Sequence, residues 1–277
     1  MNHHEDTFVA NNHTIYCQRW QPPSTAKGVL LIAHGLAEHS GRYARVAEYF
    51  VNHGYAVCAL DHIGHGKSDG KRCHIKRFSD FTETLTIFLG KIKTWIPDSP
   101  VFLIGHSMGG LISAAYLLQN QNAFRGCILS GPAIKASEQP SAALMLLNRI
   151  ISVLVPTLGM MKLAADGVSR DPVEVKAYIE DPLVHTGKVS SRMVAELFKT
   201  MSEVQTNAAA ITLPVLLLHG GEDKLAAPES STFLNEHVGS KDKKLIIYDG
   251  LYHEIFNEPE RDQVFADVLA WLDEHNN

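Results

Sequence analysis

A mostly parallel, doubly wound α/β sheet is the fold class that this 277-residue sequence predicts, on three observations. Short apolar runs alternate with helical patterns, and a strand–helix–strand order implies right-handed crossovers between parallel strands. Most of the apolar runs are continuous rather than alternating, as expected of strands buried on both faces of a sheet. The order breaks once, between Ser130 and Val215, where helical patterns continue without a convincing strand.

The predicted elements follow one another in a regular order along the chain. An early strand is expected at Thr14–Arg19. The later strands are expected where the apolar runs lie, at Gly28–Ala33, Tyr55–Leu60, Val101–Ile104, Gly126–Ser130, Val215–His219 and Lys244–Tyr248. Helical patterns occupy the intervals and the last segment, at Arg42–His53, Ser79–Trp95, Ser107–Asn120, Glu229–Val238 and Glu260–His275. These elements are predicted to form one core, made of residues 1–131 and 208–277.

The interruption, residues 132–207, is predicted to be a helical cap inserted into that core. Pro132 and Pro214 punctuate its edges, as proline commonly does at the ends of regular elements. Open α/β sheets bind their ligands at the carboxyl ends of the strands, so an insertion there would cover the binding site. The alternative is a helical elaboration at the edge of the fold, which is less favoured because pockets form at switch points and domain seams.

The composition is that of a globular protein with a sizeable core, since 45% of the residues are hydrophobic and 20% are charged. A net charge of −5 offers no broad basic face, so no nucleic-acid partner is expected. Without a CxxC pair, the cysteines are expected to be buried free thiols: Cys17, Cys58, Cys73 and Cys127. The polar segment Met1–Asp6 does not resemble a secretory signal, which favours a cytoplasmic location.

A nucleophile elbow is predicted at Gly105–Gly109, where GHSMG fits the pattern G-x-S-x-G. An apolar strand directly precedes it and a helix start of small residues follows, so Ser107 is expected at a sharp strand-to-helix turn. Small flanking residues let strand and helix pass closely, and the helix N-terminus faces a developing oxyanion. The pattern recurs at Gly66–Gly70, but Ser68 lacks this strand-to-helix context and is assigned to a turn.

The acid and the base are predicted on loops that follow later strands. Sites of this type run in the chain order serine, acid, histidine. Asp223 follows the strand Val215–His219, and His253 follows the strand Lys244–Tyr248. His253 is expected to take the proton of Ser107, while Asp223 holds the imidazole tautomer and stabilises the imidazolium.

Three nearby residues compete for these two roles. Glu222 precedes Asp223, but the shorter aspartate suits a loop position better. Asp249 ends its own strand and is expected in a turn. His219 ends an apolar strand with no predicted partner, which favours a structural histidine.

Two backbone N–H groups are predicted to form an oxyanion hole. One belongs to Met108, directly after the nucleophile, and the other to Leu36, in the loop after the strand that ends at Ala33. Gly35 fits this role and a simple tight turn equally well. No HExxH, P-loop or dinucleotide fingerprint is found, so neither a metal nor a cofactor is expected.

These motifs together resemble the monoacylglycerol lipase and lysophospholipase family of the α/β-hydrolase superfamily. The segment 34–43, HGLAEHSGRY, is similar to the family's HGxxEHxxRY, and 61–70, DHIGHGKSDG, to its DxxGHGxSxG loop. Residues 105–110 match its GHSMGG elbow, and the similarity continues at 220–225 and 252–254. The resemblance therefore spans the core, and it implies the α/β-hydrolase fold with a helical cap inserted after the sixth strand.

The resemblance also implies hydrolysis of monoacylglycerol, or a related lipid ester, to glycerol and a fatty acid. Within the cap, Tyr178–Leu183 is similar to the family's YxxDPL segment. By analogy, Glu38, Arg42 and Tyr178 would lie near the glycerol end of the substrate, as the few polar anchors of a mostly apolar pocket. The alternative for Glu38 and Arg42 is a surface pair at a helix start.

An apolar helix in the cap fits a lipid substrate. Its apolar face is expected to carry Leu144, Leu147, Ile151, Leu154 and Val155. Such a helix could make a peripheral contact with a membrane or micelle, or it could be buried against the core. The stretch Leu144–Met161 is too short and too polar to span a membrane.

Other functions stay open from the sequence alone. A carboxylesterase for short esters would share the triad but have a narrower pocket. A lysophospholipase would need a site for a phosphodiester, and Arg42 is the one obvious cation on the elbow side. A binding protein that has lost activity is disfavoured by the intact triad, and enzymes with an aspartate nucleophile are disfavoured by Ser107.

Overall fold

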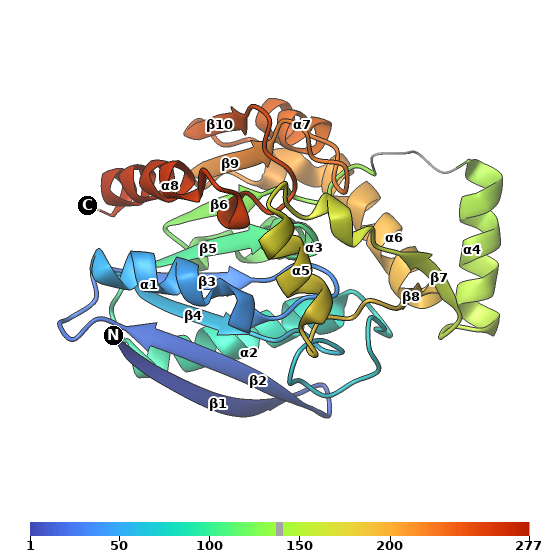
Figure 1. Ribbon diagram of the computed structural model, residues 1–277, viewed down its shortest axis with the longest axis horizontal. Helices are drawn as coiled ribbons and strands as arrows, with labels where there is room; N and C mark the ends of the chain where they lie inside the picture. The colour runs from blue at the N-terminus through green and yellow to red at the C-terminus, as the bar shows by residue number, and fades with distance from the viewer. Residues whose placement is uncertain (137–140, 277) are drawn as a thin grey trace.

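One eight-stranded sheet forms the centre of the computed structural model, which describes residues 1–136 and 141–276 (Figure 1). Its strand order is β1-β2-β4-β3-β5-β6-β9-β10. β2 pairs antiparallel with β1 and β4, and the remaining pairs are parallel. The strands are β1 Asn2–Ala10, β2 His13–Gln21, β3 Val29–Ala33, β4 Ala56–Leu60, β5 Val101–His106, β6 Gly126–Ser130, β9 Val215–Gly220 and β10 Lys243–Tyr248.

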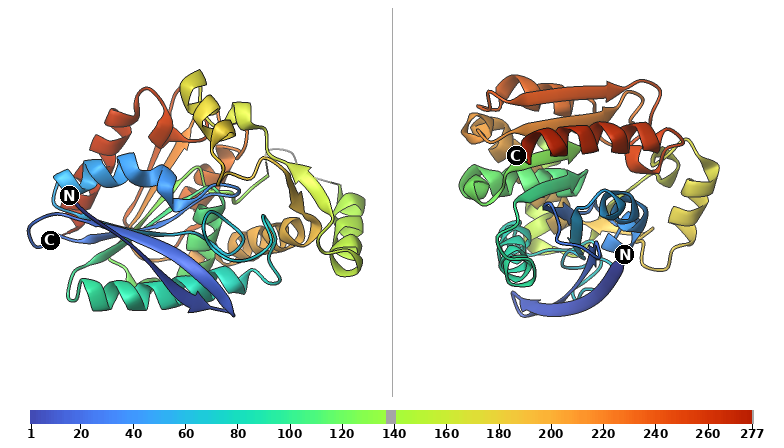
Figure 2. Two further views of the ribbon diagram at one scale, coloured as in Figure 1. Left: turned by 60° about the horizontal axis from the view of Figure 1, so that its bottom comes forward. Right: turned by 90° about the vertical axis from the view of Figure 1, so that its left-hand side faces the viewer.

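Helices cover both faces of this sheet (Figure 2). On one face lie α1 (Ala44–Asn52) and α8 (Arg261–His275), and on the other α2 (Ser79–Trp95), α3 (Met108–Asn120) and α7 (Glu229–His237). Every residue of β3, β4, β5, β6 and β9 is buried, which explains why their sequences are continuous apolar runs. The predicted doubly wound fold is therefore confirmed.

The N-terminal strand β1 is one element that the apolar pattern does not predict. Most of its side chains are exposed and polar, so it carries no hydrophobic signal. It is held by a continuous hairpin register with β2, closed by Asn11 and Asn12 at φ angles of 50° and 60°. A two-residue turn with positive φ at both positions suits a hairpin, so the Asn-Asn pair was the local signal for this strand.

The proposed cap follows β6, the sixth strand in chain order, and positions 137–140 of it lie outside the described residues. Its elements are α4 Ala142–Leu154, β7 Gly159–Lys162, α5 Pro172–Glu180, β8 Lys188–Ser190 and α6 Ser191–Asn207. The expectation of no strand here was wrong, because β7 and β8 pair antiparallel. Both are very short and far apart in sequence, so neither shows an alternating pattern. Across the described ranges, no helix has the length and apolarity needed to cross a bilayer.

Four buried histidines lie near the carboxyl ends of the central strands: His34, His62, His65 and His106. Burial lowers the pKa of all four imidazoles, to about 3 at His65 and to about 4 at His106. His62 is the extreme case, since neither ring nitrogen has a hydrogen-bond partner among the described residues. These side chains therefore stay neutral in the folded protein well below pH 6.

We expect acid to destabilise the protein through these histidines. In the unfolded chain they take up protons near their ordinary pKa of about 6.5, whereas the folded chain excludes them. The free energy of unfolding should then fall by about 1.4 kcal/mol per histidine for each pH unit below that value. Urea denaturation at pH 7.5 and pH 5.5 measures this loss.

The variant His62→Leu should show a smaller loss between the two pH values, because one proton fewer is taken up on unfolding. The matched control is His4→Leu, at an exposed position of β1. Equal pH dependence in His62→Leu and in the wild type would contradict this explanation.

Candidate active site

The turn between β5 and α3 holds Ser107 in a left-handed backbone conformation, with φ 54° and ψ −118°. Residues other than glycine rarely adopt this region, so the surroundings must enforce it. A Cβ on Gly109 would lie 2.0 Å from the carbonyl oxygen of Ala33, and one on Gly105 would lie 2.5 Å from that of Gly109. Strand and helix thus pass too closely to admit a side chain at either glycine.

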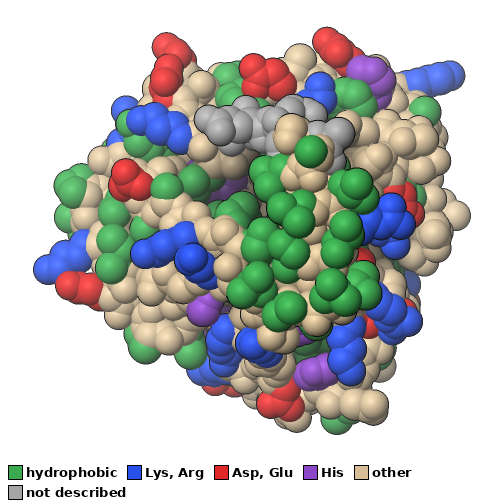
Figure 3. Space-filling view, turned by 90° about the vertical axis from the view of Figure 1, so that its right-hand side faces the viewer, with side chains coloured by type: hydrophobic (Ala, Val, Ile, Leu, Met, Phe, Trp, Pro, Cys, Tyr) green, Lys and Arg blue, Asp and Glu red, His purple; other side chains and the backbone are tan. Residues whose placement is uncertain are grey.

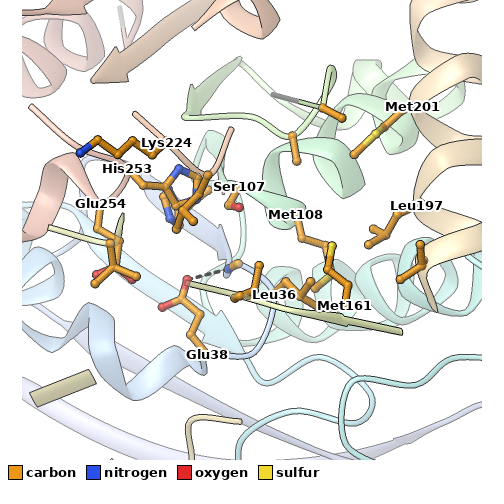
Figure 4. Close-up of a pocket in the computed structure, with 18 of the residues that line it drawn as sticks. Leu36, Glu38, Ser107, Met108, Met161, Leu197, Met201, Lys224, His253 and Glu254 are labelled. Carbon is orange, nitrogen blue, oxygen red and sulfur yellow. Dashed lines mark hydrogen bonds between the residues drawn. The ribbon is translucent and has the colours of Figure 1, made fainter. Parts of the chain in front are cut away.

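His253 and Asp223 form the hydrogen bond expected of a base and its acid. His253 Nδ1 donates to Asp223 Oδ2 over 2.6 Å, and both side chains are buried. Ser107 and His253 line one cavity and lie beside each other in Figure 4. The fold therefore assembles the candidate triad from loops after β5, β9 and β10.

Asp223 receives more hydrogen bonds than the sequence analysis anticipates. Its Oδ1 accepts from the backbone N–H groups of Leu225 and Ala226, at 2.8 and 3.0 Å. Its Oδ2 lies 3.1 Å from His219 Nε2 as well as accepting from His253. Burial alone would raise the pKa of this carboxyl, but His253, His219 and the N–H groups hold it well below its ordinary value. Asp223 is therefore ionised throughout the neutral range.

His219 is hydrogen-bonded within the fold, as expected of a structural histidine, but the sequence did not predict its contact with Asp223. Its ring is fully buried, and its Nδ1 lies 2.7 Å from the hydroxyl of Ser231. Its Nε2 faces only acceptor oxygens, so Nε2 carries the proton and donates. Nε2 lies within reach of both Asp223 and the carbonyl oxygen of Ala226. The only signal in the sequence was position, since His219 ends the strand from which the Asp223 loop departs.

The electrostatic surroundings of His253 favour its protonated form. Burial by itself would lower the pKa of this imidazole, but the Asp223 carboxylate, aided by Glu254 and Glu38, raises it above its ordinary value. A base with a raised pKa can hold the proton of a serine hydroxyl until a leaving group takes it.

The candidate oxyanion loop is fixed on both sides of Gly35. The N–H of Gly35 donates to Glu38 Oε1 over 2.7 Å (Figure 4), and its carbonyl accepts from His34 Nδ1 over 2.7 Å. Leu36 and Met108, the two proposed donors, both line the cavity beside Ser107. Met108 begins α3, and the first N–H groups of a helix have no partner within it.

Glu38 and Arg42 are part of a buried charge cluster with Glu254, so the alternative of a surface pair was wrong. Arg42 Nη1 lies 2.9 Å from Glu38 Oε2, while Nη1 and Nη2 contact the two oxygens of Glu254 at 2.6 and 2.7 Å. The guanidinium also lies over the ring of Tyr178, 4.7 Å from its centroid. Burial opposes the charge on Arg42, but the two carboxylates raise its pKa above the ordinary value. The sequence predicts no role for Glu254 beyond its place in the motif 252–254, although its position next to His253 points to this site.

A cavity of about 680 Å³ connects these groups (Figure 4). At one end it is lined by Glu38, Glu254 and Tyr178, next to Ser107 and His253. Away from the triad it is lined by apolar side chains of the cap: Met161, Leu163, Val194, Leu197, Phe198 and Met201. The site thus has one polar end and one long apolar part, with the candidate nucleophile between them.

The alternative candidates for the nucleophile and the acid, Ser68, Glu222 and Asp249, lie outside the site. The hydroxyl of Ser68 donates to the carbonyl of Asp61 over 2.6 Å and accepts the N–H of Tyr16, within a buried turn. Glu222 and Asp249 are exposed to solvent. None of these three candidates lines the cavity that contains Ser107.

A doubly wound sheet with a serine, a histidine and an aspartate placed in this way defines a serine hydrolase of the α/β-hydrolase superfamily. The family described as "Serine aminopeptidase, S33" matches residues 24–260, and the chain belongs to this family. The resemblance inferred from the motifs is thereby confirmed.

Individual relatives match along most of their length. The chain is 41% identical over 256 residues to a monoacylglycerol lipase of Mycolicibacterium smegmatis, covering 92% of this chain and 91% of that protein. It is 35% identical over 250 residues to a phospholipase of Bacillus subtilis, with 89% and 95% covered. The crystal structure of Paleococcus ferrophilus monoacylglycerol lipase superposes with a TM-score of 0.86 at 33% identity, over 94% of this chain and 99% of that chain. The predicted enzyme class, a carboxylic ester hydrolase, is therefore confirmed.

We expect His219 to be needed for the rate rather than for substrate binding. His219→Leu removes a donor to a buried carboxylate, which should lower kcat about 10- to 100-fold with little change in KM. His219→Gln keeps an N–H donor near the position of Nε2 and should retain most of the rate. Steady-state kinetics, together with thermal unfolding of both variants, measures this difference. Equal losses in the Leu and Gln variants would assign His219 to packing alone.

Proposed function

We propose that this protein hydrolyses monoacylglycerols to glycerol and a fatty acid through an acyl-enzyme on Ser107. The observation that carries the proposal is the composition of the cavity, which has a hydrogen-bonding end beside Ser107 and a long apolar part under the cap. The relatives named monoacylglycerol lipases support the same substrate. The family description names a peptidase, but a single apolar chain fits this cavity better than a peptide with polar groups throughout.

In the proposed reaction, Ser107 Oγ attacks the ester carbonyl carbon while its proton passes to His253 Nε2. The N–H groups of Leu36 and Met108 hold the oxyanion, and Asp223 stabilises the imidazolium. When the intermediate collapses, the glycerol oxygen takes the proton from His253 and leaves. A water molecule then attacks the acyl-enzyme with His253 as base, and the fatty acid and the free serine are released.

The charge cluster at the polar end favours a neutral glycerol head over a phosphodiester. The two lysines that also line the cavity, Lys135 and Lys224, have their ammonium groups over the rings of Phe233 and Tyr252. Two carboxylates, Glu38 and Glu254, surround one guanidinium, Arg42, so the cluster carries a net negative charge. Arg42 was the cation that a lysophospholipase would need, yet both of its terminal nitrogens already contact carboxylates. Glycerol hydroxyls can donate to carboxylate oxygens, whereas a phosphate would be repelled by them.

The substrate preference is tested by fatty-acid release from 1-oleoylglycerol, from oleoyl lysophosphatidylglycerol, whose head carries a net negative charge, and from a short-chain ester. We expect the monoacylglycerol to be favoured over the lysophospholipid at least about tenfold in kcat/KM, because the phosphate of the lysophospholipid is repelled by the carboxylates of Glu38 and Glu254. Ser107→Ala is the blank and should abolish release from all three. Turnover of the short ester alone would make the enzyme a general carboxylesterase, and activity that survives in Ser107→Ala would exclude Ser107 as nucleophile.

We further propose a peripheral contact between helix α4 and a membrane or micelle. The residues of α4 that face inward are polar, since Asn148 and Ser152 are 7% and 2% exposed. The expected apolar face is instead open to solvent, and Leu144, Leu147 and Leu154 are 50%, 50% and 74% exposed. Figure 3 shows hydrophobic side chains gathered there with Lys and Arg around them. A helix with its apolar side outward can lie in a lipid interface.

The double variant Leu147→Ser/Leu154→Ser should weaken binding to phosphatidylcholine vesicles at least about tenfold, because two large apolar side chains no longer enter the lipid. Sedimentation with the vesicles measures the partition, and hydrolysis of a soluble short ester should not change. Val9→Ser, an exposed apolar position in β1, is the control. Unchanged partition of the double variant would exclude α4 as the contact.

A further inference from the structure

A second groove lies in the cap, between α4 and α6, and the proposed reaction does not use it. Its volume is about 990 Å³, within the range of pockets that bind small molecules. Its lining is largely apolar: Leu144, Met145 and Val153 of α4 form its solvent-exposed rim, and Val194 and Phe198 of α6 line the other side. The volume and the apolar lining of the groove are therefore suitable for an alkyl chain.

This groove meets the active-site cavity along part of its length. Met161, Val194 and Phe198 line both spaces. In the active-site cavity these residues belong to the apolar part that would hold the acyl chain. A ligand in the groove would thus lie directly beside the acyl-binding region.

The polar groups of the groove favour an anion. Arg149, Arg192 and Lys199 line it, and Glu196 is the acidic residue among its described lining residues. Glu196 lies 3.8 Å from Arg192 and also accepts the N–H of Phe78, so its charge is already engaged. Within the described part of the chain, no acidic group lies within 4.0 Å of the charged ends of Arg149 or Lys199. Arg149 and Lys199 are therefore available to bind an anion, although the net charge of the chain is −5.

A buried amide also lines the groove. Asn148 is 7% exposed and lines the groove, and its Oδ1 has no hydrogen-bond partner among the described residues. An unpaired polar atom in such a place is costly unless a ligand or water satisfies it. This oxygen accepts hydrogen bonds, and a carboxylate has no donor to offer it, so the anion is assigned to the cations and not to Asn148.

We propose that the α4–α6 groove binds one long-chain fatty-acid anion, with its chain between the two helices and its carboxylate at Arg149 and Lys199. The inference rests on the proposed function, which produces this molecule in the adjoining cavity. The groove distinguishes product from substrate, because a monoacylglycerol carries no charge for the two cations. The groove thus provides the product with a site outside the catalytic cavity.

The test measures oleate binding after the catalytic cavity has been filled. The enzyme is first treated with a hexadecyl fluorophosphonate, which bonds covalently to an active serine and places its alkyl chain in the acyl cavity. Carboxyl-labelled oleate, below its critical micelle concentration at pH 8, is then titrated by NMR without vesicles. We expect one saturable equivalent to remain, and oleyl alcohol to compete at least about tenfold less well.

The double variant Arg149→Glu/Lys199→Glu should weaken this remaining binding at least about tenfold, since two charge-assisted contacts are lost. Lys176→Glu, an exposed cation of α5 outside the groove, is the matched control and should bind as the wild type does. Circular dichroism verifies that both variants are folded.

No saturable oleate binding in the labelled enzyme, or equal binding in the double variant, would overturn the proposal. Weaker binding of the double variant to anionic vesicles with unchanged oleate binding would also overturn it, because the cations would then serve a membrane. Failure of the fluorophosphonate to label Ser107 would contradict the proposed catalytic function instead. In that case the groove is judged on unlabelled enzyme, where the double variant should bind one equivalent of oleate fewer.

Discussion

Gly109 lies so close to Ala33 that a Cβ there would come within 2.0 Å of the Ala33 carbonyl oxygen, and the rest of the site is built around this approach. The contact holds α3 against the end of β3 and forces Ser107 into its left-handed conformation. As a result, the helix N-terminus, the loop after β3 and the serine hydroxyl converge at one point. The backbone strain is local, and the packing of two buried strands and a helix around it offsets the cost.

The charge cluster of Glu38, Arg42 and Glu254 connects three segments of the chain next to Ser107. Glu38 accepts the N–H of Gly35, and thereby fixes the loop that carries Leu36, the proposed oxyanion donor, while it also pairs with Arg42. Arg42 in turn holds Glu254, the neighbour of His253. The same residues that give the polar end of the cavity its negative charge therefore also set the position of the catalytic loops. Under the proposed function, head-group selection and the position of the candidate catalytic loops would depend on the same residues.

The cap shows the opposite distribution of polar and apolar groups from that of a core helix. In α4, Asn148 and Ser152 face α6 while the large apolar side chains face solvent. A helix arranged in this way buries little apolar surface in water. Contact with lipid would remove that surface from water and stabilise the helix. The neighbouring cavity and groove share Met161, Val194 and Phe198, so the proposed acyl binding and product binding would both involve these side chains.

The sequence by itself determined the buried strands, the elbow at Ser107 and the chain order of Asp223 and His253, because continuous apolar runs and short glycine motifs are local signals. It did not determine β1, whose mostly exposed polar residues pair with β2 and whose Glu5 and Asp6 pair with Lys67 and Lys91, residues far away in the chain. Only the tertiary structure decided that His219 contacts Asp223 and that Glu254 contacts Arg42, 212 residues apart in the chain. Partners of buried charges depend on which segments the fold brings together. The orientation of α4 was decided in the same way, since an apolar helix pattern is the same whether its face meets a core or a lipid.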